Sequence, residues 1–230
     1  MQHTDKHYID RIGWLRASVL GANDGIISTT SLVIGIAAAT PARENIILAA
    51  LAGLVAGAMS MAAGEYVSVS SQSDTERADL EREKKELETM PEEELQELTK
   101  IYEERGLSKE LAKQVAMELT KNDALAAHAR DELGINDITA AKPLQAAFSS
   151  FASFVVGALL PLLVAIFAPV ETMIYYQYAF AILFLVLLGA LSARTGGANL
   201  LKSIARVAFW GTIAMAASAL VGHIFGVDVG

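Results

Sequence analysis

The sequence predicts an all-α membrane protein with five transmembrane helices and a three-helix insert between the second and third of them. Hydrophobic residues make up 53% of the 230 residues and charged residues only 19%, whereas soluble domains carry about 25% charge. Five apolar stretches match the roughly 20 residues that a helix needs to cross a bilayer. The net charge of −8 lies in one central segment.

The charge distribution divides the chain. Residues 66–143 hold 19 acidic and 11 basic side chains, and the other 152 residues hold seven of each. We therefore expect transmembrane helices one and two in residues 1–65, an acidic helical domain in 66–142 and helices three to five in 143–230. An acidic chain with a pI near 5.0 is not expected to bind nucleic acid. The lack of cysteine excludes thiolate metal sites and disulfides.

The apolar stretches show no polar face of the kind that a soluble amphipathic helix presents. The polar N-terminal residues do not form a cleavable signal peptide, so the first stretch is expected to be retained. The five predicted spans cover about residues 12–39, 45–64, 143–170, 172–193 and 207–227.

Helix-forming residues dominate the acidic insert. The second span is expected to continue into a polar helix that ends near Thr89. Pro91 suits the first turn of a second helix, which Gly106 ends. Ser108 can cap a third helix that runs to Leu133.

Lysine and arginine mark the expected cytoplasmic side. They occur in the N-terminal tail and around residues 194–206, whereas the first loop holds only Arg43 and the third loop and the C-terminal tail hold none. This pattern predicts a cytoplasmic N-terminus and insert and an external C-terminus. The short tails without a targeting segment favour a prokaryotic plasma membrane.

Three residues of the first two spans are candidates for an ion path. Asp24 lies within the first apolar stretch, and intramembrane acids usually face the bundle interior and mark an ion or proton path. Met61 and Glu65 are four residues apart and share a helix face. A thioether near carboxylates favours transition metals over Mg²⁺ or Ca²⁺, although methionine more often only fills space in a core.

Carboxylates recur at helical spacing in the insert. Glu83 and Glu86 belong to one acidic stripe, Glu94 and Glu97 form a second pair, and His128 and Glu132 form an i, i+4 pair. Carboxylates with an imidazole suit Fe²⁺, Mn²⁺ or Zn²⁺. The alternative is a solvated charged face, which the many i, i+4 ion pairs favour.

Small residues are spaced four apart in both of the first two spans, in Gly21-x-x-x-Gly25 and Gly53-x-x-x-Gly57. Such patterns let helices approach closely. They serve either packing within one chain or a dimer interface.

The chain resembles the vacuolar iron transporter family, as a bacterial-type member. The resemblance rests on Asn23-Asp24-Gly25-Ile26, on Ser60-Met61 with Gly64-Glu65-Tyr66, on the acidic insert and on the five spans. It implies a homodimer that exchanges Fe²⁺ for protons along a path lined by the first two spans. The path aspartate and methionine fall on Asp24 and Met61, and Glu65 is expected to pass metal from the insert to the path.

The resemblance also implies that the insert binds the metal through carboxylates that fall on Glu83, Glu86, Glu94, Glu97 and Glu132. One departure is that His128 and Ala129 stand where the family carries two adjacent methionines. Histidine is a harder ligand than a thioether, so Mn²⁺ or Zn²⁺ could bind as readily as Fe²⁺.

The expected function is therefore export of Fe²⁺ from the cytoplasm in exchange for protons, by a multi-pass homodimer in a lipid bilayer. Two alternatives stay open: a membrane-anchored metal sensor or buffer without flux, and a passive divalent cation channel. An enzyme is not expected, because the sequence contains no recognisable nucleophile or metallohydrolase motif.

Overall fold

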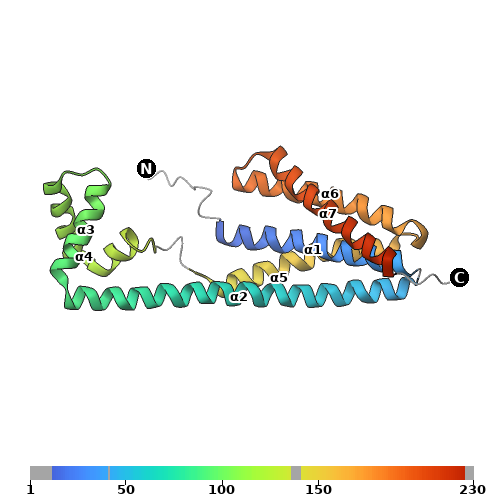
Figure 1. The fold of residues 1–230 in the computed structure, drawn as a ribbon, viewed down its shortest axis with the longest axis horizontal. Coiled ribbons are helices and arrows are strands. Elements are labelled where there is room, and N and C mark those ends of the chain that lie inside the picture. The colour runs from blue at the N-terminus through green and yellow to red at the C-terminus, as the bar shows by residue number, and fades with distance from the viewer. Residues whose placement is uncertain (1–11, 41, 136–140, 226–230) are drawn as a thin grey trace, which may run out of the picture. The chain divides into compact units, whose positions relative to one another are not determined.

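The computed structural model describes residues 12–40, 42–135 and 141–225, and all the regular elements in these ranges are helices (Figure 1). The all-α prediction is confirmed. In chain order the elements are α1 (Ile12–Ala39), α2 (Arg43–Thr89), α3 (Pro91–Glu104), α4 (Lys109–Asp131), α5 (Pro143–Phe167), the 3₁₀ turn η2 (Val170–Thr172), α6 (Met173–Gly196) and α7 (Leu200–Phe225).

Five helices in the described part of the chain are long and apolar enough to cross a membrane, as predicted: α1, α2, α5, α6 and α7. The last of them begins at Leu200 rather than near Val207. The residues before Val207 include the charged Lys202 and Arg206, but Asn199 caps the helix by accepting a hydrogen bond from the backbone N–H of Lys202 at 3.0 Å. The predicted end of this span, residues 226–227, lies outside the described residues.

The chain forms two compact units, one of Met1–Val67 with Leu144–Gly230 and the other of Ser68–Pro143. Helix α2 runs through the boundary. Its 47 residues rise about 70 Å at about 1.5 Å per residue, more than twice a hydrocarbon core of about 30 Å. Only the apolar N-terminal half of α2 is therefore needed to span a bilayer.

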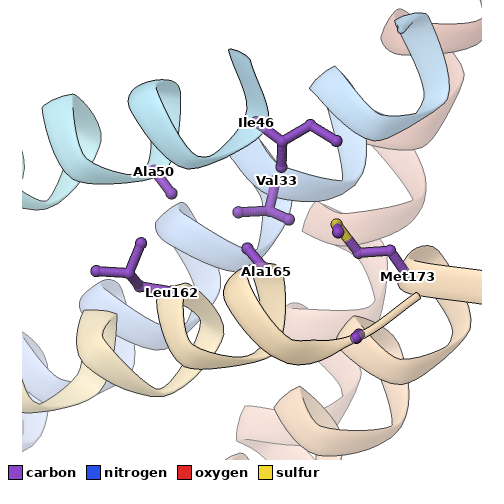
Figure 2. Packing of buried hydrophobic residues seen from close by; sticks show 7 residues of the cluster. Val33, Ile46, Ala50, Leu162, Ala165 and Met173 are labelled. Atoms are coloured by element: carbon purple, nitrogen blue, oxygen red, sulfur yellow. The ribbon is translucent and has the colours of Figure 1, made fainter. Parts of the chain in front are cut away.

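One core of the first unit joins four helices. Figure 2 shows side chains that meet between α1, α2, α5 and the start of α6. All of the labelled residues are buried: Val33, Ile46, Ala50, Leu162, Ala165 and Met173. This packing holds the first two spans against the third.

Glycines let α1 lie directly against α5. A Cβ atom on Gly25 would lie 2.3 Å from the carbonyl oxygen of Phe154, and one on Gly157 would lie 2.4 Å from that of Ala22. On α2, a Cβ atom on Gly57 would meet the ring of Phe154 at 2.2 Å. These small residues therefore serve packing within one chain, the first of the two alternatives.

Arg43, the first residue of α2, binds the carboxyl end of α5. Its Nη1 donates to the carbonyl oxygens of Ala165 at 3.3 Å and Ile166 at 2.5 Å, and its Nη2 donates to that of Ala168 at 2.6 Å. The last carbonyls of a helix have no partner within the helix, and a cation near them is favourable. Arg43 thus ties the start of α2 to the end of α5.

In the second unit, α3 packs against α4 through Leu98, Ala116 and Ala127. Pro91 occupies the first turn of α3, as predicted. Gly106 follows α3 with a positive φ of 99°, a conformation that favours glycine. The hydroxyl of Ser108 then accepts from the backbone N–H of Leu111 at 3.4 Å and caps α4.

Candidate metal centre and membrane cavity

Four potential metal ligands gather in the second unit. One ligand atom from each of Glu83, Glu94, His128 and Glu132 lies within 4.8 Å of the other three. Four ligands arranged tetrahedrally around a metal at about 2.1 Å lie about 3.4 Å from one another, so small shifts of these side chains would fit one ion. Glu83, Glu94 and His128 are buried.

The imidazole of His128 lies at the centre of this group. Its Nδ1 atom is 2.9 Å from Glu83 Oε1, 2.9 Å from Glu132 Oε2 and 3.7 Å from Glu94 Oε2. The contact with Glu132 has hydrogen-bond geometry. His128 is completely buried, and its Nε2 atom has no hydrogen-bond partner among the described residues.

The carboxylates of this cluster are close enough to repel one another. Glu83 lies in the polar half of α2, beyond the apolar part, where burial and the negative charge of Glu132 raise its pKa to about 7. Burial likewise raises the pKa of Glu94, against the attraction of His128. A divalent cation would relieve this repulsion, because it favours the charged form of each carboxylate.

A kink within α4 separates the part that carries ligands from the part before it. Asp123 has φ −160° and ψ 96°, which is not helical. Its Oδ1 atom accepts from the backbone N–H of Ala126 at 3.0 Å, which is the geometry of an N-cap. Asp123 therefore begins a new short helical segment, and that segment carries His128 and leads to Glu132.

Beside Glu132, Asp131 fixes the end of α4 to α3. Tyr102 of α3 donates to its carboxylate at 2.7 Å, Arg105 directly after α3 donates at 2.6 Å, and the neighbouring Arg130 donates at 2.7 Å. Burial opposes the charge of Asp131, but these hydrogen bonds outweigh it and hold its pKa below the usual range. The ligand-bearing segment is thus capped at its beginning and held at its end by Tyr102 and Arg105.

Two predicted ligands lie outside the group of four. Glu86 forms an ion pair with Arg82 at 3.0 Å, and Glu97 is exposed. Their charges still contribute to raising the pKa of Glu94, so both lie near the cluster.

In the first unit, Asp24 of α1 and Met61 of α2 line the same cavity of about 180 Å³. Phe154 of α5 and the glycines Gly53 and Gly57 of α2 also line it. The third predicted path residue, Glu65, is half-buried one helical turn beyond Met61 and is not among the lining residues. The structure therefore brings Asp24 and Met61 together and leaves Glu65 beyond them.

Hydroxyl groups complete this cavity, and sequence reasoning missed them. Ser28, Thr29 and Ser60 also line it. Thr29 is buried, and its Oγ1 atom has no partner among the described residues. The sequence did contain a signal, since residues 28–31 are four consecutive hydroxyl residues within an apolar span, where polar side chains usually face the interior.

The two sites offer different chemistry. The cluster in the second unit provides oxygen and nitrogen ligands, which suit Fe²⁺, Mn²⁺ and Zn²⁺. The cavity in the first unit provides one carboxylate, hydroxyl oxygens and a thioether, which suit brief contact with a transition metal better than tight binding.

Known proteins resemble the chain over most of its length. The family model described as the VIT family matches residues 15–223. A protein of Acanthamoeba castellanii named vacuolar iron transporter is 45% identical over 225 residues, which cover 95% of this chain and 81% of that protein. A soybean (Glycine max) protein named VIT-like transporter 1b is 36% identical over 214 residues, covering 93% and 76%. Vacuolar iron transporter homolog 4 of Arabidopsis thaliana is 37% identical over 216 residues, covering 94% and 85%.

Proposed function

The chain belongs to the VIT family, and from this premise we propose that it transports ferrous iron across a membrane in exchange for protons. One observation carries the proposal. Asp24 and Met61, from the first two spans, line one cavity together with Phe154 of the third. A carboxylate and a thioether in such a place suit a passing transition metal, and intramembrane acids usually mark an ion path.

Proton exchange requires one site that two ligands can occupy in turn. Asp24 meets this requirement, because a carboxylate binds either a proton or a metal ion. The hydroxyl oxygens of Ser28, Thr29 and Ser60 would replace part of the water around the ion, and Met61 would select against hard cations. A proton gradient then drives metal transport whenever protonation of Asp24 releases the metal on one side.

The acidic cluster would capture the metal before it enters the path. Glu83, Glu94, His128 and Glu132 supply four ligand atoms, and Glu86 and Glu97 add negative charge nearby. Glu65 would pass the ion from the insert toward Met61. The oxygen and nitrogen ligands accept Mn²⁺ and Zn²⁺ as well as Fe²⁺, so all three are candidate substrates.

We further propose that two copies form the path between them. The apolar half of α2 exposes Leu48, Val55 and Met59, with exposed fractions of 67%, 60% and 60%. These residues recur at helical spacing along one face. Such a face suits a second copy in the bilayer, and the glycines remain available for packing within each copy.

The proposed direction is export from the cytoplasm, with the insert on the cytoplasmic side. It follows from the lysine and arginine pattern and from the role of the insert in collecting metal. A prokaryotic plasma membrane stays the predicted location, whereas several relatives carry the word vacuolar in their names.

The deciding experiment measures Fe²⁺ flux into proteoliposomes under an imposed pH gradient. Wild type is compared with Asp24→Asn, which keeps the shape of the side chain, and with Glu171→Gln, the same chemical change in an exposed loop residue. We expect flux that follows the gradient in wild type and Glu171→Gln and is lost in Asp24→Asn.

Other outcomes would replace the proposal. Flux that ignores the gradient would make the protein a passive channel. Metal binding without flux in any of the three proteins would make it a sensor or buffer. Normal flux in Asp24→Asn would remove Asp24 from the path.

A further inference from the structure

A second and larger cavity lies in the first unit, apart from the one that Asp24 lines. It measures about 480 Å³ and is formed by the beginning of α1, the end of α6 and the loop and first turns of α7. Its residues do not overlap with those of the Asp24 cavity. It therefore needs an explanation other than the ion path.

The lining of this groove is mostly apolar and includes two basic residues. Leu20, Leu188 and Val207 provide apolar walls, while Arg16 and Arg206 provide two cations. Both arginines are exposed, neither forms an ion pair with a described residue, and no acidic residue lines the groove. Two unpaired cations above an apolar channel match an anion that carries a hydrocarbon chain.

Asn23 adds a polar atom on the inside of the groove. Its side chain lines the groove, and its Oδ1 atom is buried without a hydrogen-bond partner among the described residues. A buried acceptor without a donor costs free energy, so a ligand that supplies a hydroxyl group here would be favoured.

We propose that this groove binds an anionic phospholipid whose headgroup carries a free hydroxyl, such as phosphatidylglycerol. The phosphate lies between Arg16 and Arg206, the hydroxyl donates to Asn23, and one acyl chain follows Leu20, Leu188 and Val207. Basic pockets between transmembrane helices on the cytoplasmic side are typical binding sites for acidic headgroups. The basic end of this unit is also the end that the lysine and arginine pattern predicts to be cytoplasmic.

The test is native mass spectrometry of the full chain, released from detergent with equimolar phosphatidylglycerol, phosphatidylserine and phosphatidylcholine. We expect one phosphatidylglycerol per chain to be retained in preference to the other two lipids. Arg16→Gln with Arg206→Gln should weaken this binding about 30-fold, since each basic residue near a membrane surface contributes about five-fold, or about 1 kcal/mol. Asn23→Ala should weaken the retention of phosphatidylglycerol, because the headgroup hydroxyl then has no acceptor in the groove.

The matched control is Arg194→Gln with Lys202→Gln, which removes two exposed cations that are not among the residues lining the groove. It should retain lipid as wild type does. An equal loss in both double variants would overturn the proposal, because the attraction would then be diffuse. Retention of phosphatidylcholine equal to that of phosphatidylglycerol would also overturn the proposal. So would displacement of phosphatidylglycerol by inorganic phosphate at the same concentration, since the acyl chain would then contribute nothing. A different ratio of monomer to dimer in the variant with Arg16→Gln and Arg206→Gln, with unchanged lipid binding, would also overturn the proposal. The groove would then be an interface between copies.

Discussion

At the scale of single residues, burial separates candidate ligands that look alike in the sequence. Glu83 and Glu86 lie on one stripe of α2, and Glu94 and Glu97 lie one turn apart on α3. In each pair one carboxylate is buried beside His128 and the other is more exposed. Glu86 and Glu97, the more exposed members, should therefore affect metal binding only through their charge.

Replacing Glu94 should therefore affect metal binding more than replacing Glu97. We expect Glu94→Gln to weaken Mn²⁺ binding by about 10- to 100-fold, the range found when a metal shell is disturbed. Glu97→Gln, the same change one turn away, should weaken it less than about threefold, the effect of a screened charge. Calorimetric titration of the full chain in detergent measures both. Equal losses would mean that the four-residue group is not the binding site.

The raised pKa of Glu83 predicts how the stability of the insert depends on pH. The folded insert binds the proton of the Glu83 carboxyl group more tightly than the unfolded chain does. This protonation therefore adds fully to the free energy of unfolding below about pH 4.5, and its contribution is lost as pH rises to about 7. The protection factors of α3 and α4 amides, which are corrected for the base-catalysed rise of intrinsic exchange, should therefore fall over this range in the metal-free full chain. Mn²⁺ should restore protection because it binds the folded state. Glu83→Gln should flatten the profile, and an unchanged slope in this variant would assign the effect to other groups.

At the scale of helices, the sequence predicted most of the described structure. Apolar stretches locate the spans because a bilayer requires about 20 such residues in a row. Pro91, Gly106 and Ser108 locate the helix ends of the insert because each acts through local backbone chemistry. The kink at Asp123 escaped this reasoning, since aspartate within a run of good helix formers fits an exposed helix face equally well. All four residues of the ligand cluster are among the predicted ligands. Spacing could not separate them from Glu86 and Glu97, because it does not tell which side of α2 and α3 the helix α4 will cover.

The kink in α4 should matter for metal binding through the orientation of the short segment that follows it. Asp123→Ala removes the cap, which typically costs about 1 kcal/mol, and a segment this short has little helical stability of its own. We expect the Mn²⁺ affinity to fall about five-fold, with recovery in Asp123→Asn, which can still cap.

Ser108 provides the control for this prediction. It caps the opposite end of α4, which carries none of the four ligands. Ser108→Ala should therefore cost comparable stability in thermal unfolding and leave the Mn²⁺ affinity unchanged. Equal affinity losses in Ser108→Ala and Asp123→Ala would show a general loss of folding rather than a positioning role.

At the scale of the whole molecule, the orientation can be measured directly because the chain contains no cysteine. A single Lys100→Cys variant places a thiol on the polar insert, and a single Glu171→Cys variant places one in the loop between α5 and α6. Both positions are exposed. An impermeant maleimide added to intact cells that express the protein in the plasma membrane should label the Glu171→Cys variant at once. It should label the Lys100→Cys variant only after permeabilisation, and the reverse pattern would invert the predicted topology.

The contact between Arg43 and the end of α5 also bears on how the protein is made. The guanidinium group and the carbonyls that it binds are 122 to 125 residues apart in the chain. At about 5–20 residues per second, a ribosome needs roughly 6–25 s to synthesise the intervening segment. Arg43 therefore leaves the ribosome well before its partners exist, and the first two spans complete this end of the bundle only after the third has been inserted.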